Sequence, residues 1–410
     1  MSSNRWARKL INLSSRLAHM NRLEDALNAI LEAVDIQRRL AADRATTNNA
    51  DLAPSLEYLS SHLSHLGHHE RALVACREAV DLFRQLATDC PSTFRSALAI
   101  SINSLSKRLS RLGHREQALE ASLEAVTLNR RLAADRPSAF NAYLASSLDH
   151  LSSRLSHIGR HEQALEVCWE AVNLYRELSL DRPTTFNSAL ATSINNLSKR
   201  LSHLGNHEQA LEASREAVNL TRQLAANLPS LFNTGLALSL NNLSCDLSSL
   251  GHHEQALEAI QEAVGLRRQL AVDRPAVFNV YLASSLDHLS ICLSHSGHHD
   301  HALGASQEAV DLNRPLAEDH PTVFSPCLAS SLNNLSCNHS RLGHREQALN
   351  AIQEAVDIFR SLVADRPSVF NADLASSLDS LSSRLSHLGH YKQALDACQE
   401  AMDIHRGASV

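Results

Sequence analysis

Histidine is the residue type whose number and spacing first suggest chemistry in this sequence. The chain has 24 histidines, and some stand beside acidic residues, as in His68-His69-Glu70 and His252-His253-Glu254. Imidazole and carboxylate groups are common zinc ligands, which bind the metal at about 2 Å. Adjacent side chains in a tight turn diverge, however, and equivalent turns of stacked helix pairs lie about 10 Å apart. We therefore expect these clusters to bind no metal.

Residues with catalytic potential are present, but not in the arrangements that catalysis needs. The sequence contains no phosphate-binding glycine loop, nucleophile elbow or HExxH segment. The eight cysteines have irregular spacing and form no CxxC pair, which argues against a zinc site or a disulfide framework. The serines recur at like positions, whereas a catalytic site brings unlike groups together. The sequence predicts no catalytic residue, no cofactor and no enzymatic activity.

The elements that would position any site are set by internal repetition with a constant period of 46 residues. One turn position carries Asn21, Gly67, Gly113, Gly159, Gly205, Gly251, Gly297, Gly343 and Gly389. A proline lies 24 residues after the glycine in seven repeats, from Pro91 to Pro367. The period predicts nine repeats and about 18 helices.

Each repeat has the pattern of two amphipathic helices. Residues 275–293 place Phe278, Leu282, Leu286 and Leu293 on one face of a 3.6-residue helix, here called helix A. Pro275 suits the first helical turn, and a glycine such as Gly251 suits the left-handed conformation that ends such a helix. Residues 253–271 form a second apolar stripe and predict helix B.

Two alanines recur in every helix B, five and twelve residues after the turn position, as in Ala256 and Ala263. Helices packed about 8–10 Å apart need small side chains where they approach most closely. A single helix pair cannot bury its apolar stripe, so neighbouring pairs must stack. We expect an all-α solenoid that runs as one domain over residues 1–410.

The order of these residues resembles the tetratricopeptide repeat family. The matching residues of one repeat are Leu240, Leu243, Ser244, Leu247, Gly251, Ala256, Ile260 and Ala263. The 46-residue period also fits HEAT and armadillo repeats, but the paired alanines and the glycine turn argue against them. The long repeats are similar to those of kinesin light chains, which carry a like Leu-Asn-Asn-Leu run, present here at 240–243 and 332–335. The serine-rich array also resembles those attached to nucleotide-binding signalling proteins of fungi and bacteria.

The resemblance implies a right-handed superhelix whose concave groove is lined by helix A. Polar residues of helix A are then the implied ligand contacts, with asparagines bonding a peptide backbone and lysines meeting an acidic group. These candidates are Asn103, Lys107, Asp149, Asn195, Asn196, Lys199, Asn241, Asn242, Asp287, Asn333, Asn334 and Asp379. The alternative is that they form only the solvated face of helix A.

Charge and hydropathy narrow the class of partner. The formal charge is −6 and the basic residues are scattered, so no nucleic-acid partner is expected. No apolar stretch approaches the roughly 18 residues of a membrane span, and the start has no secretory signal pattern. The sequence predicts a cytoplasmic scaffold or adaptor that binds a peptide or protein segment. A regulatory arm of a larger nucleotide-binding signalling protein and self-association through uncapped terminal repeats remain open alternatives.

Overall fold

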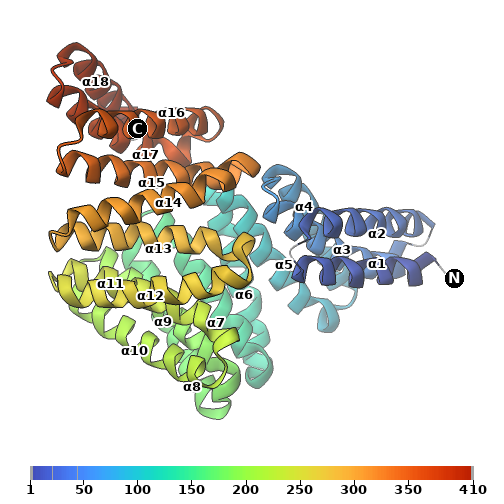
Figure 1. Ribbon diagram of the computed structural model, residues 1–410. Helices are drawn as coiled ribbons and strands as arrows, with labels where there is room; N and C mark the ends of the chain where they lie inside the picture. The colour runs from blue at the N-terminus through green and yellow to red at the C-terminus, as the bar shows by residue number, and fades with distance from the viewer. Residues whose placement is uncertain (1–2, 21, 44, 408–410) are drawn as a thin grey trace. The chain divides into compact units, whose positions relative to one another are not determined.

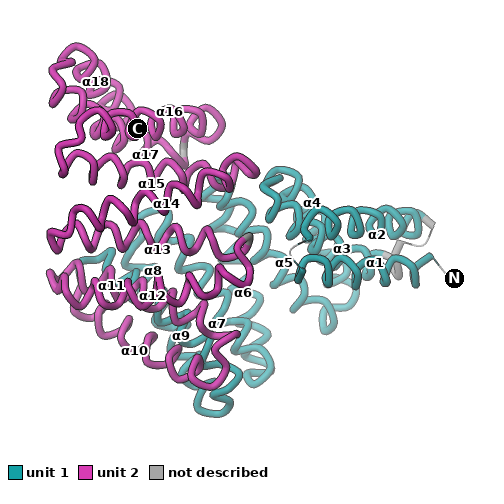
Figure 2. Tube along the Cα trace, in the orientation of Figure 1, with its two compact units in different colours: residues 1–205 teal, residues 206–410 magenta. Residues whose placement is uncertain are grey.

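The computed structural model describes residues 3–20, 22–43 and 45–407, and every regular element in these ranges is an α-helix. The chain divides into two compact units, Met1–Gly205 and Asn206–Val410 (Figure 2). The helices of the first unit are α1 Ser3–His19, α2 Leu23–Asp43, α3 Ala45–His65, α4 His69–Asp89, α5 Pro91–Arg111, α6 Arg115–Asp135, α7 Pro137–His157, α8 His161–Asp181 and α9 Pro183–His203. Those of the second are α10 His207–Asn227, α11 Pro229–Ser249, α12 His253–Asp273, α13 Pro275–His295, α14 His299–Asp319, α15 Pro321–Arg341, α16 Arg345–Asp365, α17 Pro367–His387 and α18 Tyr391–Gly407.

Proline and glycine fix the helix boundaries as the sequence predicts. Each odd-numbered helix from α5 to α17 begins at the repeated proline, whose missing N–H is no loss in a first turn. The glycines from Gly67 to Gly389 have φ between 77° and 83°, a left-handed conformation that a Cβ atom disfavours. Behind Gly251, the His252 N–H donates to the Leu247 carbonyl at 2.9 Å and closes the end of α11. The predicted turn residue Asn21 lies outside the described residues.

Within a repeat, the two helices meet at the predicted small residues. The first alanine of each helix B, from Ala26 to Ala348, is fully buried, and so is the second, from Ala33 to Ala401. A serine of helix A donates its hydroxyl to the carbonyl of the first alanine, as Ser152 does to Ala164 and Ser244 to Ala256, both at 2.8 Å. This hydrogen bond can form because serine and alanine are small enough for the backbones of the two helices to approach closely.

Between repeats, helix B packs against the helix A that follows it, so each unit is a stack of helices with antiparallel neighbours (Figure 1). The second stacking contact joins successive B helices through exposed ion pairs 40 residues apart, such as Arg130–Glu170 and Arg268–Glu308, both at 2.6 Å. Exposed pairs contribute about 0–1 kcal/mol each, so the apolar stack carries most of the stability. The expected all-α solenoid is confirmed.

Candidate partner-binding surface

Most of the polar helix-A residues predicted to contact a ligand lie instead within a repeat-to-repeat hydrogen-bond ladder. In the first unit, Asn103 donates to the Ser147 hydroxyl at 2.7 Å, and Ser193 donates to Asp149 Oδ1 at 3.0 Å. In the second unit the ladder has the same 44-residue step. Its bonds are Ser285 to Asn241 at 2.7 Å, Ser331 to Asp287 at 2.6 Å and Asn333 to Ser377 at 2.9 Å.

The second asparagine of the Leu-Asn-Asn-Leu run, and of the matching Ile-Asn-Asn-Leu run at 194–197, strengthens this ladder. Asn196 donates to Asp149 Oδ1 at 3.4 Å, and Asn334 donates to Asp287 Oδ1 at 3.2 Å. Burial raises the pKa of both Asp149 and Asp287 to about 6, although the hydrogen bonds from serine and asparagine oppose that shift. These carboxyl groups therefore act first as stacking acceptors.

Three other predicted site residues occupy these same two helix positions: Asn195 and Asp379 align with Asn103, and Asn242 aligns with Asn196. Asn195 and Asn242 are buried, so little of either side chain faces solvent. Asp379 belongs to α17 and is exposed, with His405 Nε2 of α18 at 3.9 Å from its Oδ2. Whether any of the twelve residues contacts a ligand stays a prediction, but the ladder explains most of them without one.

The first unit also has a row of arginines that the sequence reasoning missed. Arg108, Arg154 and Arg200 occupy the same position of three successive A helices, α5, α7 and α9. Their hydrogen bonds within the described residues go to serine hydroxyls of the preceding helix A, such as Arg108 Nε to Ser60 at 3.0 Å and Arg200 Nη1 to Ser156 at 3.1 Å. Serine hydroxyls accept these hydrogen bonds but carry no charge that would neutralise the guanidinium groups.

Arg154 has a donor that its neighbours leave unpaired. It is only 9% exposed, and its Nε has no hydrogen-bond partner within the described residues. Burial, and then the positive charges of Arg111 and Arg200, lower the pKa of Arg154 to about 10. A buried guanidinium with cationic neighbours is stabilised by negative charge brought near it.

Further cations extend this row to the surface. Lys107 is exposed, and desolvation by the neighbouring helices, followed by Arg108, Arg154 and Arg111, lowers its pKa. Lys199 is exposed on α9. We call this set the cationic face and define it as Lys107, Arg108, Arg111, Arg154, Lys199 and Arg200.

Histidines beside the cationic face are held in their neutral form. Burial, and then the charges of Lys107 and Arg154, lower the pKa of His150 to about 4. Burial also lowers the pKa of His157, and Arg154 and Arg200 add to that effect. The positive potential therefore comes from lysine and arginine, not from histidine.

The second unit does not repeat this row. The positions that correspond to Arg108 carry Asp246, Cys292 and Asn338, and a cation returns only at Arg384. Asn338 donates to the Ser290 hydroxyl at 2.7 Å, so a neutral side chain takes over the same stacking role. The signal was therefore present in the sequence as arginine at one position of three consecutive repeats.

Other kinds of site find little support in the part of the chain that the structure describes. There, no three histidine, cysteine, aspartate or glutamate side chains come together as a metal site would require. Among the same residues, no helix combines the length and apolar character that a membrane crossing requires.

Comparison with known proteins agrees with this architecture. The family model described as Tetratricopeptide repeat matches residues 144–181, 190–225, 236–274, 328–367 and 374–408. A second model, Anaphase-promoting complex subunit 5, matches residues 1–52, 43–90, 86–136 and 273–323. The five repeats matched by the first model are thus tetratricopeptide repeats, as their residue pattern indicates. No curated protein matches this chain.

Solved structures share the fold at low sequence identity. A Rap protein complexed with competence and sporulation factor is 14% identical with a TM-score of 0.54, and the match covers 99% of each chain. Aspartyl phosphate phosphatase F from Bacillus subtilis is 14% identical with a TM-score of 0.53, covering 99% of this chain and 94% of that one. A kinesin light chain-like array of nearly identical repeats from Podosopora anserina is 17% identical with a TM-score of 0.42, covering 54% and 97%.

Proposed function

We propose that this chain is a non-enzymatic protein-interaction scaffold and that the cationic face of its first unit binds an acidic protein segment. The observation that carries the proposal is the row of arginines on α5, α7 and α9, whose side chains bond to serines, together with Lys107, Arg111 and Lys199, which extend the positive charge to the exposed surface. An interaction scaffold of this kind needs binding groups and no catalytic ones.

A carboxylate from a ligand would offset the positive charge of this surface. Burial, and then other cations close by, lower the pKa values of Arg154 and Lys107. The charged groups that act on Arg154 are the cations Arg111 and Arg200. A carboxylate at the exposed Lys107 would reduce that repulsion, so the surface favours an acidic segment over a neutral one.

The spacing of the row suits an extended chain. Successive A helices lie about 10 Å apart, and a peptide in the polyproline II conformation rises about 3.1 Å per residue with three residues per turn, so every third side chain faces the same way. Acidic residues at every third position would then meet successive repeats. The Rap protein complexed with competence and sporulation factor supports a binding role for this fold.

The test is a titration of the full chain into a fluorescein-labelled peptide with glutamate at every third position, followed by anisotropy. A peptide with glutamine in place of glutamate is the control ligand. Lys107→Glu should weaken binding of the acidic peptide about fivefold, the effect of roughly 1 kcal/mol. Lys392→Glu reverses an exposed lysine of α18 in the second unit and should leave binding unchanged. Equal binding of the two peptides, or equal effects of the two variants, would refute the proposal.

Two expectations from the sequence stay predictions beside this proposal. One is that residues 1–410 form a single continuous solenoid, and the other is that the protein works in the cytoplasm.

A further inference from the structure

The last helix pair exposes side chains that are buried in the other repeats. Met402 of α18 is 39% exposed, whereas the valines at its position in the eight preceding repeats are 0–3% exposed. Those valines are Val34, Val80, Val126, Val172, Val218, Val264, Val310 and Val356. Leu395 is 67% exposed, while its equivalents in the preceding repeats are buried or half-buried. We call Leu395 and Met402 the α18 face.

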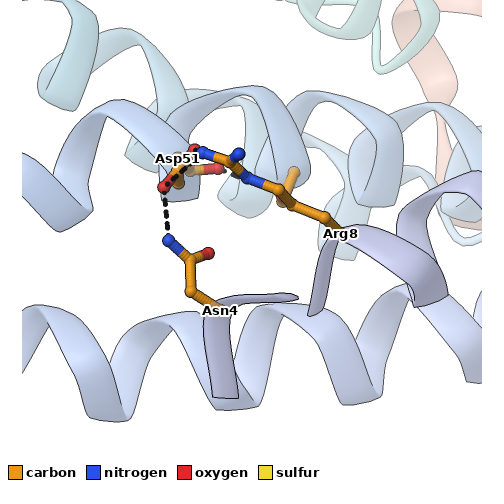
Figure 3. A network of polar contacts seen from close by, with 4 residues as sticks. Asn4, Arg8 and Asp51 are labelled. Carbon is orange, nitrogen blue, oxygen red and sulfur yellow. Dashed lines mark hydrogen bonds and ion pairs between the residues drawn. The ribbon is translucent and has the colours of Figure 1, made fainter. Parts of the chain in front are cut away.

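The first helix exposes the opposite side of the same contact. Trp6 of α1 is 45% exposed, whereas the leucines at its position, from Leu52 to Leu374, are 3–7% exposed. Leu13 is 47% exposed, and its equivalents Leu59 and Leu151 are buried. We call Trp6 and Leu13 the α1 face. Asp51 of α3 anchors this helix, since it accepts from Asn4 at 2.9 Å and pairs with Arg8 at 3.1 Å (Figure 3).

The two faces correspond to the two sides of every internal stacking contact. In one such contact, Leu73 and Val80 of α4 share a core cluster with Leu98 and Ile102 of α5. In the 46-residue repeat, Leu395 and Met402 occupy the positions of Leu73 and Val80. Trp6 occupies the position of Leu98. The α1 helix of a second copy could therefore pack on the α18 face through the same repeat positions that join each helix B to the following helix A.

The exposed ion-pair ladder continues in the same register. Each internal rung joins an arginine to a glutamate 40 residues later, as in Arg360–Glu400 at 2.6 Å. Arg406 of α18 occupies the arginine position of the next rung, and its side chain is 75% exposed. The glutamate position of that rung is filled by the exposed Glu32 of a second copy, whose Oε1 accepts from Trp6 Nε1 of its own chain at 3.1 Å and whose other oxygen can meet Arg406.

The serine ladder also continues, with a change of residue that favours two chains. Asp379 occupies the acceptor position of α17. The donor position in a second copy carries the exposed Lys9, where the other eight repeats have a buried serine, from Ser55 to Ser377. Lysine is unsuited to a buried internal rung but pairs well with an exposed aspartate.

We propose that copies of this 410-residue chain associate head to tail, with the α18 face of one copy packed on the α1 face of the next and with Asp379–Lys9 and Arg406–Glu32 pairs between copies. This association uses neither the cationic face nor its ligand. An apolar contact matched by complementary charges on both sides fixes the partner as a second copy.

Sedimentation velocity of the full chain from about 1 to 100 μM tests this. The mean mass should rise with concentration to at least that of two chains. Leu395→Glu and Trp6→Glu should each abolish the rise, and an equimolar mixture of the two variants should stop at two chains because each keeps one intact face. Val272→Glu adds the same charge at an 83% exposed position of α12 and should associate like the parent.

Charge reversal tests the register without touching the apolar core. Asp379→Lys and Lys9→Asp should each weaken association, and the double variant should restore it. A chain that stays monomeric at every concentration, or association that is unchanged in Leu395→Glu, would overturn the proposal, and so would a double variant no better than either single one.

Discussion

Enlarging the first alanine of one helix B, Ala256→Leu, should destabilise the second unit by about 2–4 kcal/mol. Ala256 is fully buried in the core cluster with Leu240, Leu247 and Ile260. Ser244 lies against its backbone, with an oxygen–oxygen distance of 2.8 Å, so no room exists for a leucine side chain. Overpacking costs about 1–3 kcal/mol, and separating the helices breaks this hydrogen bond, which contributes about another 1 kcal/mol.

The assay is urea unfolding followed by helical circular dichroism, together with amide exchange of α11 and α12. The midpoint should fall, and exchange should accelerate first in these two helices, because each repeat contacts only its neighbours. Ala226→Leu makes the same change at an exposed position of α10 and should stay within about 0.5 kcal/mol of the parent. Equal midpoints for Ala256→Leu and the parent would refute the close-approach explanation of the repeated alanines.

Three further outcomes follow from individual residues. Asp149→Asn, the residue that other repeats carry at this position, should stabilise the chain by about 1–2 kcal/mol at pH 7.5 and by about half as much at pH 5, because the penalty of a carboxyl whose pKa is raised from 3.8 to about 6 is lost as the pH falls from 6 toward 3.8; pH-dependent urea unfolding measures this, and an equal gain at both pH values would contradict it. His150, with its pKa lowered to about 4, favours the folded state above pH 6.5 and loses that contribution as the pH falls, so the parent should lose about 1 kcal/mol more than His150→Asn between pH 7.5 and 5.5, and parallel losses would refute the assignment. Pro315 lies inside α14 and removes a helical hydrogen bond, so Pro315→Gln should raise the melting temperature and stabilise by up to about 3 kcal/mol, whereas an unchanged melting temperature would show that the bond is not missed.

The helices could be predicted from the sequence because local rules determine them. Pro229 and Gly251 set the ends of α11 through backbone geometry that needs no tertiary information. The buried alanines could be predicted as well, since period and size alone assign them to the contact between helices.

The roles of the polar residues could not be assigned in the same way. Asn103 and Asp149 bond to serines one repeat away, and that pairing depends on how successive A helices are offset along their axes. The sequence does hold a clue, because Ser147 and Ser193 stand two residues before the ladder residue of their own repeats. Each polar residue, taken alone, suggests a contact with a ligand in the groove. The serine of the next repeat must be considered as well to predict the ladder.

The cationic face was missed for a related reason. Arg154 reads as a surface residue in a polar segment, and only the stack shows that it is buried between Arg111 and Arg200. Burial depends on tertiary packing, so charge alone did not distinguish Arg154 from exposed arginines such as Arg130.

The most direct test of the proposed binding role is hydrogen exchange of the full chain with and without the acidic peptide, resolved by helix. The account predicts slower exchange concentrated in α5, α7 and α9, where the cationic face lies, and none of this protection with the glutamine peptide. Protection confined to the second unit, or equal protection by both peptides, would contradict it.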